Sequence, residues 1–400
     1  MEKLLEKNKF AEKLRTNYNW PQIAEIVYLV ALAAYLISNF IGGTMFSVYV
    51  SKSLLANIAE LASAVVAIKI FVVDHWDWEK ALIILLFGLL FWGVYQRSMD
   101  PSFFYYFVFV IGAKNVSFKK ILKLFLYLEV CMIIITLIAA AAGWITSITI
   151  GRRDEATVRL ALGMIYPTDF AARTFYLLVT FALYRDFKFD LPEYIGAVAL
   201  TFTMYFLTDT RIDFILMLLL IILIAAKKQV FRFLAFFNRR ILTGSIFIFI
   251  MLNVVLAYLY SPTNPILRIA NKLLSGRLTY GHEAFKRFNV TLFGQVVPQV
   301  GNGGIHHGTF DYFFIDVSFI RVLMMLGVFC FIVLMYFIWY LFKHYDQLQL
   351  YSFTVALLLI ILSSVIDQHL LELSFNIIFL SAFANLSYWQ HSNSAQLKEQ

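Results

Sequence analysis

The sequence predicts an all-α polytopic integral membrane protein. Of its 400 residues, 61% are hydrophobic and only 14% are charged, whereas about 25% of the residues of a soluble domain are charged. Apolar runs of about 18 residues or more, the length that a helix needs to cross a bilayer, recur along the chain. Cys131 and Cys330 both lie inside such runs, which favours neither a disulfide framework nor a metal site.

About twelve segments are candidate transmembrane helices. They cover roughly 22–42, 53–73, 80–96, 102–113, 121–146, 169–185, 193–208, 211–226, 241–260, 312–342, 350–366 and 369–388. The fourth is short enough to be tilted or re-entrant, and the tenth is long enough to contain a break. The chain is thereby divided into an N-terminal segment (1–20), nine spans (21–260), a large loop (261–311), three spans (312–388) and a tail (389–400). No removable signal peptide is expected, because no small-residue cleavage site follows the charged N-terminus.

The distribution of basic residues predicts the orientation. Lysines and arginines gather in the N-terminal segment and in residues 114–123 and 227–240, which twelve spans would place on one face. Basic loops stay in the cytoplasm, so both termini are expected there and the 261–311 loop outside. The acidic "DHWDWEK" at 74–80 fits this orientation poorly. The net charge of +8 therefore reports topology, and no nucleic-acid partner is expected.

The external loop has its own expected structure. It begins near "SPTNP" and contains "GNGG" at 301–304, both typical of turns. Between them, "NPILRIANKLLSGRLTYGHEAFKRF" alternates apolar and polar residues with a helical period. Interfacial helices that contact membrane lipids are therefore expected here.

The positive-inside rule leaves a set of outward arginines unexplained. Charged groups at membrane depth tend to mark functional cavities, although each arginine could instead snorkel to headgroups or pair with a nearby aspartate. The planar guanidinium binds phosphate oxygens in a bidentate way and keeps its charge. An outward cationic cavity for a lipid-linked phosphate or diphosphate is thus predicted from Arg152, Arg153, Arg159, Arg173, Arg211, Arg268, Arg277 and Arg287.

Other chemistries find less support. His306 and His307 lie in a glycine-rich turn, with no acidic residue or cysteine at metal-ligand spacing, so no metal site is expected. No nucleotide-binding glycine loop, serine elbow or zincin motif is present. Chemistry driven by a cytoplasmic nucleotide is therefore not indicated.

Five segments, in order, resemble Wzy-like bacterial polysaccharide polymerases. "NKLLSGRLTYGHEAF" resembles the Asn-x-x-Leu-Ser-Gly-Arg stretch before the large outer loop of that family. "VRLALGMIYPTDFAA" is similar to its Arg-x-x-Leu-Gly-Phe-x-x-Pro-Asn segment, and "LTDTRIDFI" to its Ser-Arg-Thr segment. "DVSFIRVLMMLGV" is similar to its Asp-Asn-Ser-Tyr segment, with Val317 for Asn and Phe319 for Tyr, and "HLLELSFNIIFLSAF" to its Glu-then-Asn ending.

The resemblance implies a GT-C-like architecture related to O-antigen ligases in the bacterial cytoplasmic membrane. The donor would be a growing glycan on undecaprenyl diphosphate and the acceptor a lipid-linked repeat unit, with no cofactor and no metal. A flippase and a chain-length regulator would be further partners. The resemblance assigns catalytic roles to Arg277, Arg211 and, as the base, Asp316. It assigns glycolipid binding to Arg159, Arg173, Ser275, Gly276, Tyr280 and Glu372, and leaves His307 and Asp311 as alternative bases.

Two alternatives stay open. A ligase of the same architecture would transfer a finished glycan once to another acceptor. A lipid-linked oligosaccharide flippase would form no bond, but it would place ionisable residues along a path through the membrane, whereas this sequence concentrates them toward the outer face.

Overall fold

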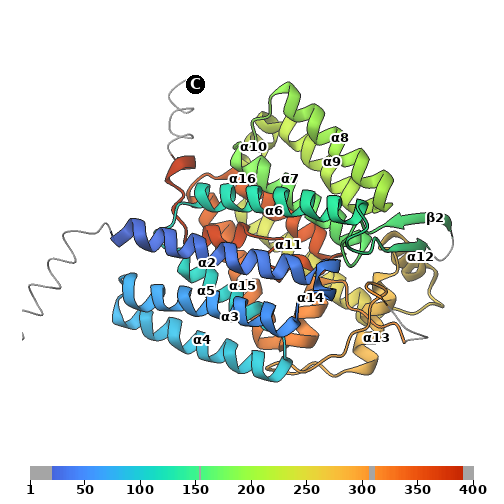
Figure 1. Ribbon diagram of the computed structural model, residues 1–400, viewed down its shortest axis with the longest axis horizontal. Coiled ribbons are helices and arrows are strands. Elements are labelled where there is room, and N and C mark those ends of the chain that lie inside the picture. The colour runs from blue at the N-terminus through green and yellow to red at the C-terminus, as the bar shows by residue number, and fades with distance from the viewer. Residues whose placement is uncertain (1–19, 153–154, 306–310, 391–400) are drawn as a thin grey trace, which may run out of the picture.

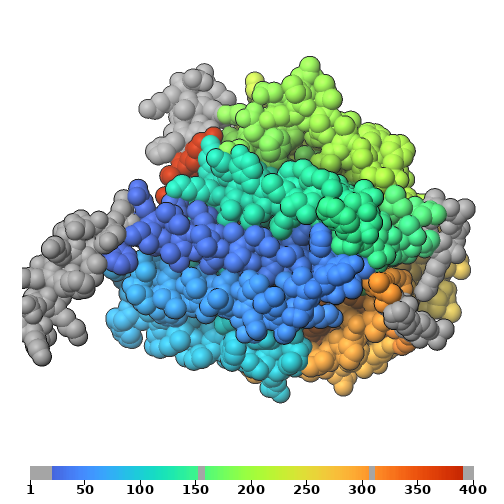
Figure 2. All heavy atoms as spheres, viewed as in Figure 1, coloured from blue at the N-terminus to red at the C-terminus, as the bar shows by residue number. Residues whose placement is uncertain are grey.

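The computed structural model describes residues 20–152, 155–305 and 311–390, and they form a helical bundle with one small hairpin. The first half contains α2 (Trp20–Gly42), α3 (Lys52–Ile68), α4 (Trp78–Ser98), α5 (Ser102–Gly112) and α6 (Phe118–Ala141). A 3-10 turn (Met45–Val48) follows α2, and a π-helical turn (Lys69–Val73) extends α3. Figure 2 shows α2 and α6 lying lengthwise beside each other on one face of the molecule.

The second half begins with a hairpin and continues with helices. The strands are β1 (Thr149–Arg152) and β2 (Glu155–Leu160), and the helices that follow are α7 (Pro167–Tyr184), α8 (Leu191–Thr208), α9 (Arg211–Ala225), α10 (Lys227–Phe236), α11 (Arg239–Tyr258), α12 (Pro265–Leu273) and α13 (Arg277–Arg287). The last helices are α14 (Ser318–Arg321), a π-helical turn (Val322–Leu326), α15 (Gly327–Gln347) and α16 (Tyr351–Ser364).

Helix length and composition make this a multi-pass membrane protein. Among the described residues, six helices are long and apolar enough to cross a membrane: Trp20–Gly42, Lys52–Val73, Trp78–Ser98, Phe118–Ala141, Arg239–Tyr258 and Ser318–Gln347. A seventh would be the pair α9 and α10, which is bent by 86°. The predicted fourth span is indeed short, since α5 has 11 residues.

The prediction of a twelfth transmembrane helix at 369–388 is wrong. Residues 369–386, all within the described part of the chain, contain 3-10 turns at His369–Leu371 and Ile378–Ala382 but no α-helix. Their apolar side chains are buried against protein, and Asn376 supports the irregular backbone by donating to the Leu370 carbonyl and accepting from the Ile378 amide. Non-helical chain is tolerated at membrane depth only where protein buries it in this way, and hydropathy does not distinguish the two cases.

The hairpin was not predicted. Its strands pair antiparallel, with Ile150 opposite Arg159, in a stretch that the sequence left as a connection between spans. Figure 1 places it at the same end of the bundle as α12 and α13. This end is called the loop end below.

The opposite end, called the basic end, gathers both ends of the described chain. The Ser117 amide donates to the Glu25 carboxylate at 3.0 Å, and the Phe118 amide donates to the Asn385 carbonyl at 3.0 Å. Lys120 pairs with Glu25 at 2.6 Å. These contacts place the segment 114–123 at the basic end. The segment 227–240, which contains α10, also lies away from the loop end (Figure 1). Both are basic segments that were predicted to share a face.

The acidic segment at 74–80 also reaches the basic end, where its charge is partly neutralised. Asp74 pairs with Lys69 at 2.8 Å, and Lys114 donates to the His75 carbonyl. The ammonium of Lys114 also lies 3.6 Å from the centre of the Trp76 ring, a favourable cation–π distance. These contacts explain how an acidic turn can share an end with basic segments.

Two helices form the enclosed centre of the bundle. Most side chains of α7 and α16 are buried, including the aromatic Phe175 and Tyr176. The first turn of α7 and the turn after α16 both open at the loop end. Polar groups at these two positions are consequently held by the most rigidly packed part of the molecule.

Candidate functional site

Two adjoining cavities lie at the loop end. The smaller has a volume of about 170 Å³ and the larger about 750 Å³. Of the described residues, Tyr166, Asp169 and Gln368 line both, so these side chains form the wall between the two cavities.

The smaller cavity brings together all three predicted catalytic residues and two of the predicted binding residues. Arg159, Arg211, Ser275, Arg277 and Asp316 all line it, although they come from the hairpin, the start of α9, the α12–α13 connection and the segment before α14. The sequence motifs thus converge in space.

The local backbone directs Arg277 into this cavity. Ser275 and Gly276 adopt left-handed conformations, with φ of 53° and 87°, and Gly276 is the N-cap residue directly before α13. A side chain added at Gly276 would meet only ordinary contacts, the nearest being Tyr280 at 3.9 Å. Glycine is therefore favoured here by its positive φ.

The guanidinium of Arg277 is held by three elements. Its Nε donates to the Ile366 carbonyl at 3.2 Å and lies 3.5 Å from Asp316 Oδ2. Its Nη1 donates to the Ser275 carbonyl at 3.1 Å. Arg277 and Asp316, to which the resemblance assigned catalytic roles, thus form a partly exposed ion pair.

Arg159 joins the hairpin to the turn between α8 and α9. Its Nε donates to the Thr208 carbonyl at 2.7 Å, and its Nη2 to the Thr210 hydroxyl at 3.2 Å. Arg211 follows directly as the first residue of α9. The hairpin that the sequence missed therefore supplies one wall of the cavity.

The prediction of a cationic cavity needs correction. The described lining of the smaller cavity contains three arginines and five aspartates: Arg159, Arg211, Arg277, Asp169, Asp209, Asp213, Asp316 and Asp367. The aspartates were read from the sequence as possible partners of single arginines. The fold instead gathers acids from α7, α9 and the turn after α16 around the same space, so the lining has mixed charge.

Arg173 lines the larger cavity. Its guanidinium lies 4.2 Å from the ring centres of both Phe40 and Phe375, and its Nη1 is 3.0 Å from Glu129 Oε1. Its side chain is 1% exposed, so it neither snorkels nor pairs with an aspartate. Its partner is a glutamate buried in α6, which the sequence analysis did not single out.

Arg321 is a site residue that the sequence analysis missed. It lines the larger cavity and donates to the side-chain oxygens of Gln299 at 3.2 Å and Gln368 at 3.1 Å. In the described part of the chain no carboxylate forms an ion pair with it. Its position in the apolar run "SFIRVLMMLGV" was the available signal, since a lone charge there usually marks a cavity.

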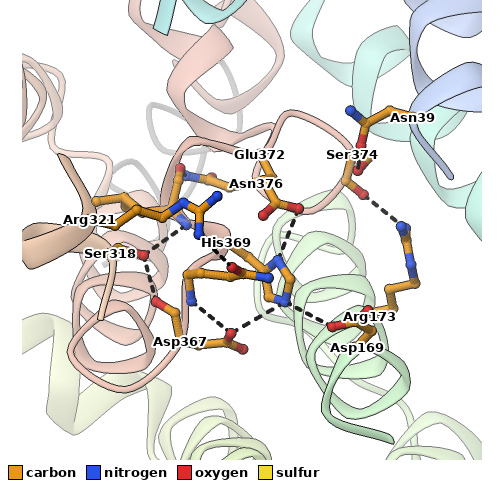
Figure 3. Close-up of polar contacts among 12 residues, drawn as sticks. Asn39, Asp169, Arg173, Ser318, Arg321, Asp367, His369, Glu372, Ser374 and Asn376 are labelled. Carbon is orange, nitrogen blue, oxygen red and sulfur yellow. Dashed lines mark hydrogen bonds and ion pairs between the residues drawn. The ribbon is translucent and has the colours of Figure 1, made fainter. Parts of the chain in front are cut away.

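His369 stands at the centre of a buried carboxylate cluster, shown in Figure 3. Its Nε2 lies 3.3 Å from Asp367 Oδ1 and 3.7 Å from Asp169 Oδ1, and its Nδ1 lies 3.1 Å from Glu372 Oε2. The imidazole stacks on Phe375 with ring centres 3.7 Å apart. Burial raises the pKa of the Asp367 carboxyl to about 6, against the opposing effect of His369.

The other predicted residues lie in different places. Glu372 lines the larger cavity, and Tyr280 packs edge-on against Tyr312, with ring centres 5.0 Å apart. Asp311 pairs with Arg287 at 2.9 Å, and its side chain is 77% exposed. It is not among the described residues that line the two cavities. His307 lies outside the described residues. Within the described part, no group of three or more histidine, cysteine or acidic side chains is arranged to hold a metal ion.

Comparison of the chain with models of known protein families, with curated proteins and with solved structures finds no match.

Proposed function

We propose that this protein is a polysaccharide polymerase that transfers a growing glycan from undecaprenyl diphosphate onto a lipid-linked repeat unit. The observation that carries the proposal is the convergence of the five segments that resemble Wzy-like polymerases. They are spread over residues 158–383, yet each contributes side chains to the two adjoining cavities. These side chains are Arg159 and Asp169, Arg211, Arg277, Asp316 and Arg321, and His369 and Glu372.

The smaller cavity suits the diphosphate end of the donor. Arg159, Arg211 and Arg277 offer planar donors to phosphate oxygens and stabilise the charge that develops on the leaving group. The neighbouring aspartates accept hydrogen bonds from sugar hydroxyls. A lining of mixed charge therefore suits a glycosyl diphosphate better than a bare anion.

The larger cavity suits the acceptor. Its volume of about 750 Å³ falls in the range of cavities that enclose ligands of several hundred daltons, and the sugars of one repeat unit are of this size. Asp316, which lines the smaller cavity, and Asp169, which lines both cavities, are carboxylates that could take the proton from the attacking hydroxyl.

The proposal also sets the topology. The loop end would face outward from the bacterial cytoplasmic membrane, and the basic end, with both termini, would face the cytoplasm. The chain would cross twelve times, the last crossing being the irregular segment 369–388. A flippase would deliver the substrate to the outer leaflet, and a chain-length regulator would act on the product.

The test is incubation of the purified protein with a lipid-linked repeat unit alone, followed by sizing of the products. The proposal predicts a ladder of repeats from the native protein and a much weaker one from Arg277→Ala at equal protein concentration. A single transfer to a different acceptor would identify a ligase. Movement of the glycolipid across the bilayer without a new glycosidic bond would identify a flippase and refute the polymerase.

A further inference from the structure

We infer that the transfer takes place at the wall between the two cavities, with Asp169 as the catalytic base and His369 as the residue that positions it. This inference rests on the proposed function and changes the assignment of the base, which the family resemblance placed on Asp316.

The position of Asp169 is the first argument. Donor and acceptor must bring the attacking oxygen and the anomeric carbon to within about 3–3.5 Å. If each substrate occupies its own cavity, this approach is possible only at the shared wall. Among the described residues that form this wall, Tyr166, Asp169 and Gln368, only Asp169 carries a group that can accept a proton near neutral pH.

The second argument is how Asp169 is held. It lies in the first turn of α7, which starts with Pro167 after Tyr166, and a carboxylate is stabilised near a helix N-terminus. The side chain is 11% exposed, and its Oδ1 faces His369 Nε2 at 3.7 Å. A base in this position meets the cavities while its backbone is fixed by a buried helix.

His369 is itself held on several sides. Phe375 stacks on one face of its ring. As Figure 3 shows, Glu372 faces Nδ1, and Asp367 and Asp169 both face Nε2. Arg173 and Arg321 lie around the same cavity. The imidazole can thus hold the Asp169 carboxylate in place and balance part of the negative charge gathered there.

Asp316 has a different setting. Asp316 lines the smaller cavity and not the larger one. Its Oδ2 lies 3.5 Å from Arg277 Nε. A carboxylate beside the arginine that faces the leaving diphosphate is placed to orient that arginine. It lies on the donor side of the wall, away from the acceptor.

The acceptor hydroxyl oxygen forms a bond to the anomeric carbon of the donor while the bond from that carbon to the diphosphate oxygen breaks. Undecaprenyl diphosphate leaves with the electron pair, and its charge is taken by Arg159, Arg211 and Arg277. The hydroxyl proton passes to a carboxylate oxygen of Asp169.

The test compares two carboxylate-to-amide variants in the polymerisation assay. In Asp169→Asn the turnover number should fall by about 100-fold or more while KM changes little. Undecaprenyl diphosphate should still bind, as measured by the quenching of intrinsic fluorescence. In Asp316→Asn the main change should be weaker binding of undecaprenyl diphosphate. Asp346→Asn, at the basic end, is the matched control and should behave like the native protein.

Two further variants protect the test against misfolding. Formate should raise the turnover number of Asp169→Gly at least tenfold, because a small carboxylate can enter the space that the side chain has left. A purely structural defect would not respond to formate. His369→Gln keeps Asp169 but removes the imidazole that positions it. This variant should lower the turnover number about tenfold with KM unchanged.

The outcomes are distinguishable. Native turnover in Asp169→Asn, or loss of turnover in Asp316→Asn with diphosphate binding intact, would overturn the assignment of the base while leaving the polymerase in place. Absence of a ladder from the native protein would instead remove the proposed function.

Discussion

Arg277 uses its guanidinium in several directions at once. Nε faces the Ile366 carbonyl and Asp316, and Nη1 faces the Ser275 carbonyl. An ammonium is a point charge on a flexible stem and cannot reproduce this planar set of donors. Arg277→Lys is therefore expected to be nearly as damaging as Arg277→Ala, with a loss of about 2–4 kcal/mol of transition-state stabilisation, or roughly 30- to 1000-fold in rate.

The measurement is the rate of repeat addition at matched protein concentration, with Lys343→Arg as a conservative exchange outside the site. Full polymer yield from Arg277→Lys would reduce Arg277 to an ordinary loop cation.

Gly303 has a more local role. A Cβ at this position would lie 2.6 Å from the Tyr166 ring and 2.7 Å from Ile165, closer than real Cβ contacts allow. Gly303→Ala should therefore displace Tyr166 from the wall between the cavities and slow the reaction by up to about 100-fold. Gly93→Ala, where nothing lies within 4 Å of the added carbon, is the control. Equal rates for both variants would show that the position of Tyr166 does not matter.

At the residue scale, the sequence predicted some of the site for a physical reason. Arg211 stands at the edge of an apolar run, where a charge is costly and a site accounts for it, and Arg277 was singled out by the family resemblance of its segment. The prediction of site residues failed where the partner of a charged side chain lies far from it in the sequence. Glu129 is 44 residues from Arg173, and the gathering of aspartates depends on how α7, α9 and α16 pack.

At the scale of elements, α12 has the form of a helix that lies in the membrane interface. Ile266, Ile269 and Leu273 are 75%, 63% and 76% exposed, and with 3.6 residues per turn they share one face. Arg268 and Lys272 flank that face, where they can reach anionic headgroups. The interfacial helix expected from the sequence is thus present as a helix, and its contact with lipid is a prediction.

Fluorescence quenching measures that contact. A bimane label on Ile269→Cys should be quenched strongly by lipids that carry a nitroxide on the acyl chain, and a label on Lys272→Cys much less, in protein that lacks Cys131 and Cys330. Equal quenching at both positions would place α12 in water.

Secondary-structure elements were predicted well where hydropathy alone determines them. Long apolar runs bounded by charges became helices, as in α6 and α11. The hairpin at 149–160 carries no strong turn signal at its tip and was missed. Residues 369–386 are apolar enough for a span, but Asn376 and the packed neighbours stabilise a non-helical chain that no periodicity reveals.

At the scale of the whole molecule, the basic segments 114–123 and 227–240 and the two cavities lie at opposite ends of the bundle. Lys120 and Lys227 pair near the ends of α2 and α7 at the basic end, whereas the arginines of the cavities lie at the loop end. Basic segments beside membrane spans stay cytoplasmic. The arrangement therefore predicts that the cavities open outside the cell, where lipid-linked repeat units would be joined.

Cysteine accessibility tests this orientation. In a background without Cys131 and Cys330, Thr263→Cys should react with an impermeant maleimide added to sealed cells, and Ala235→Cys should react only after the cells are permeabilised. Both residues are exposed, one before α12 and one in α10. Gly281 is unsuitable, because a Cβ there would lie 2.8 Å from Ile320 and 2.9 Å from Ala257 and would force α13 off the bundle. Reaction of Ala235→Cys in sealed cells, with Thr263→Cys protected, would show that the orientation in the membrane is the reverse of the predicted one. The arginines would then face the cytoplasm, and a polymerase acting on glycolipids of the outer leaflet would be ruled out whatever the geometry of its cavities.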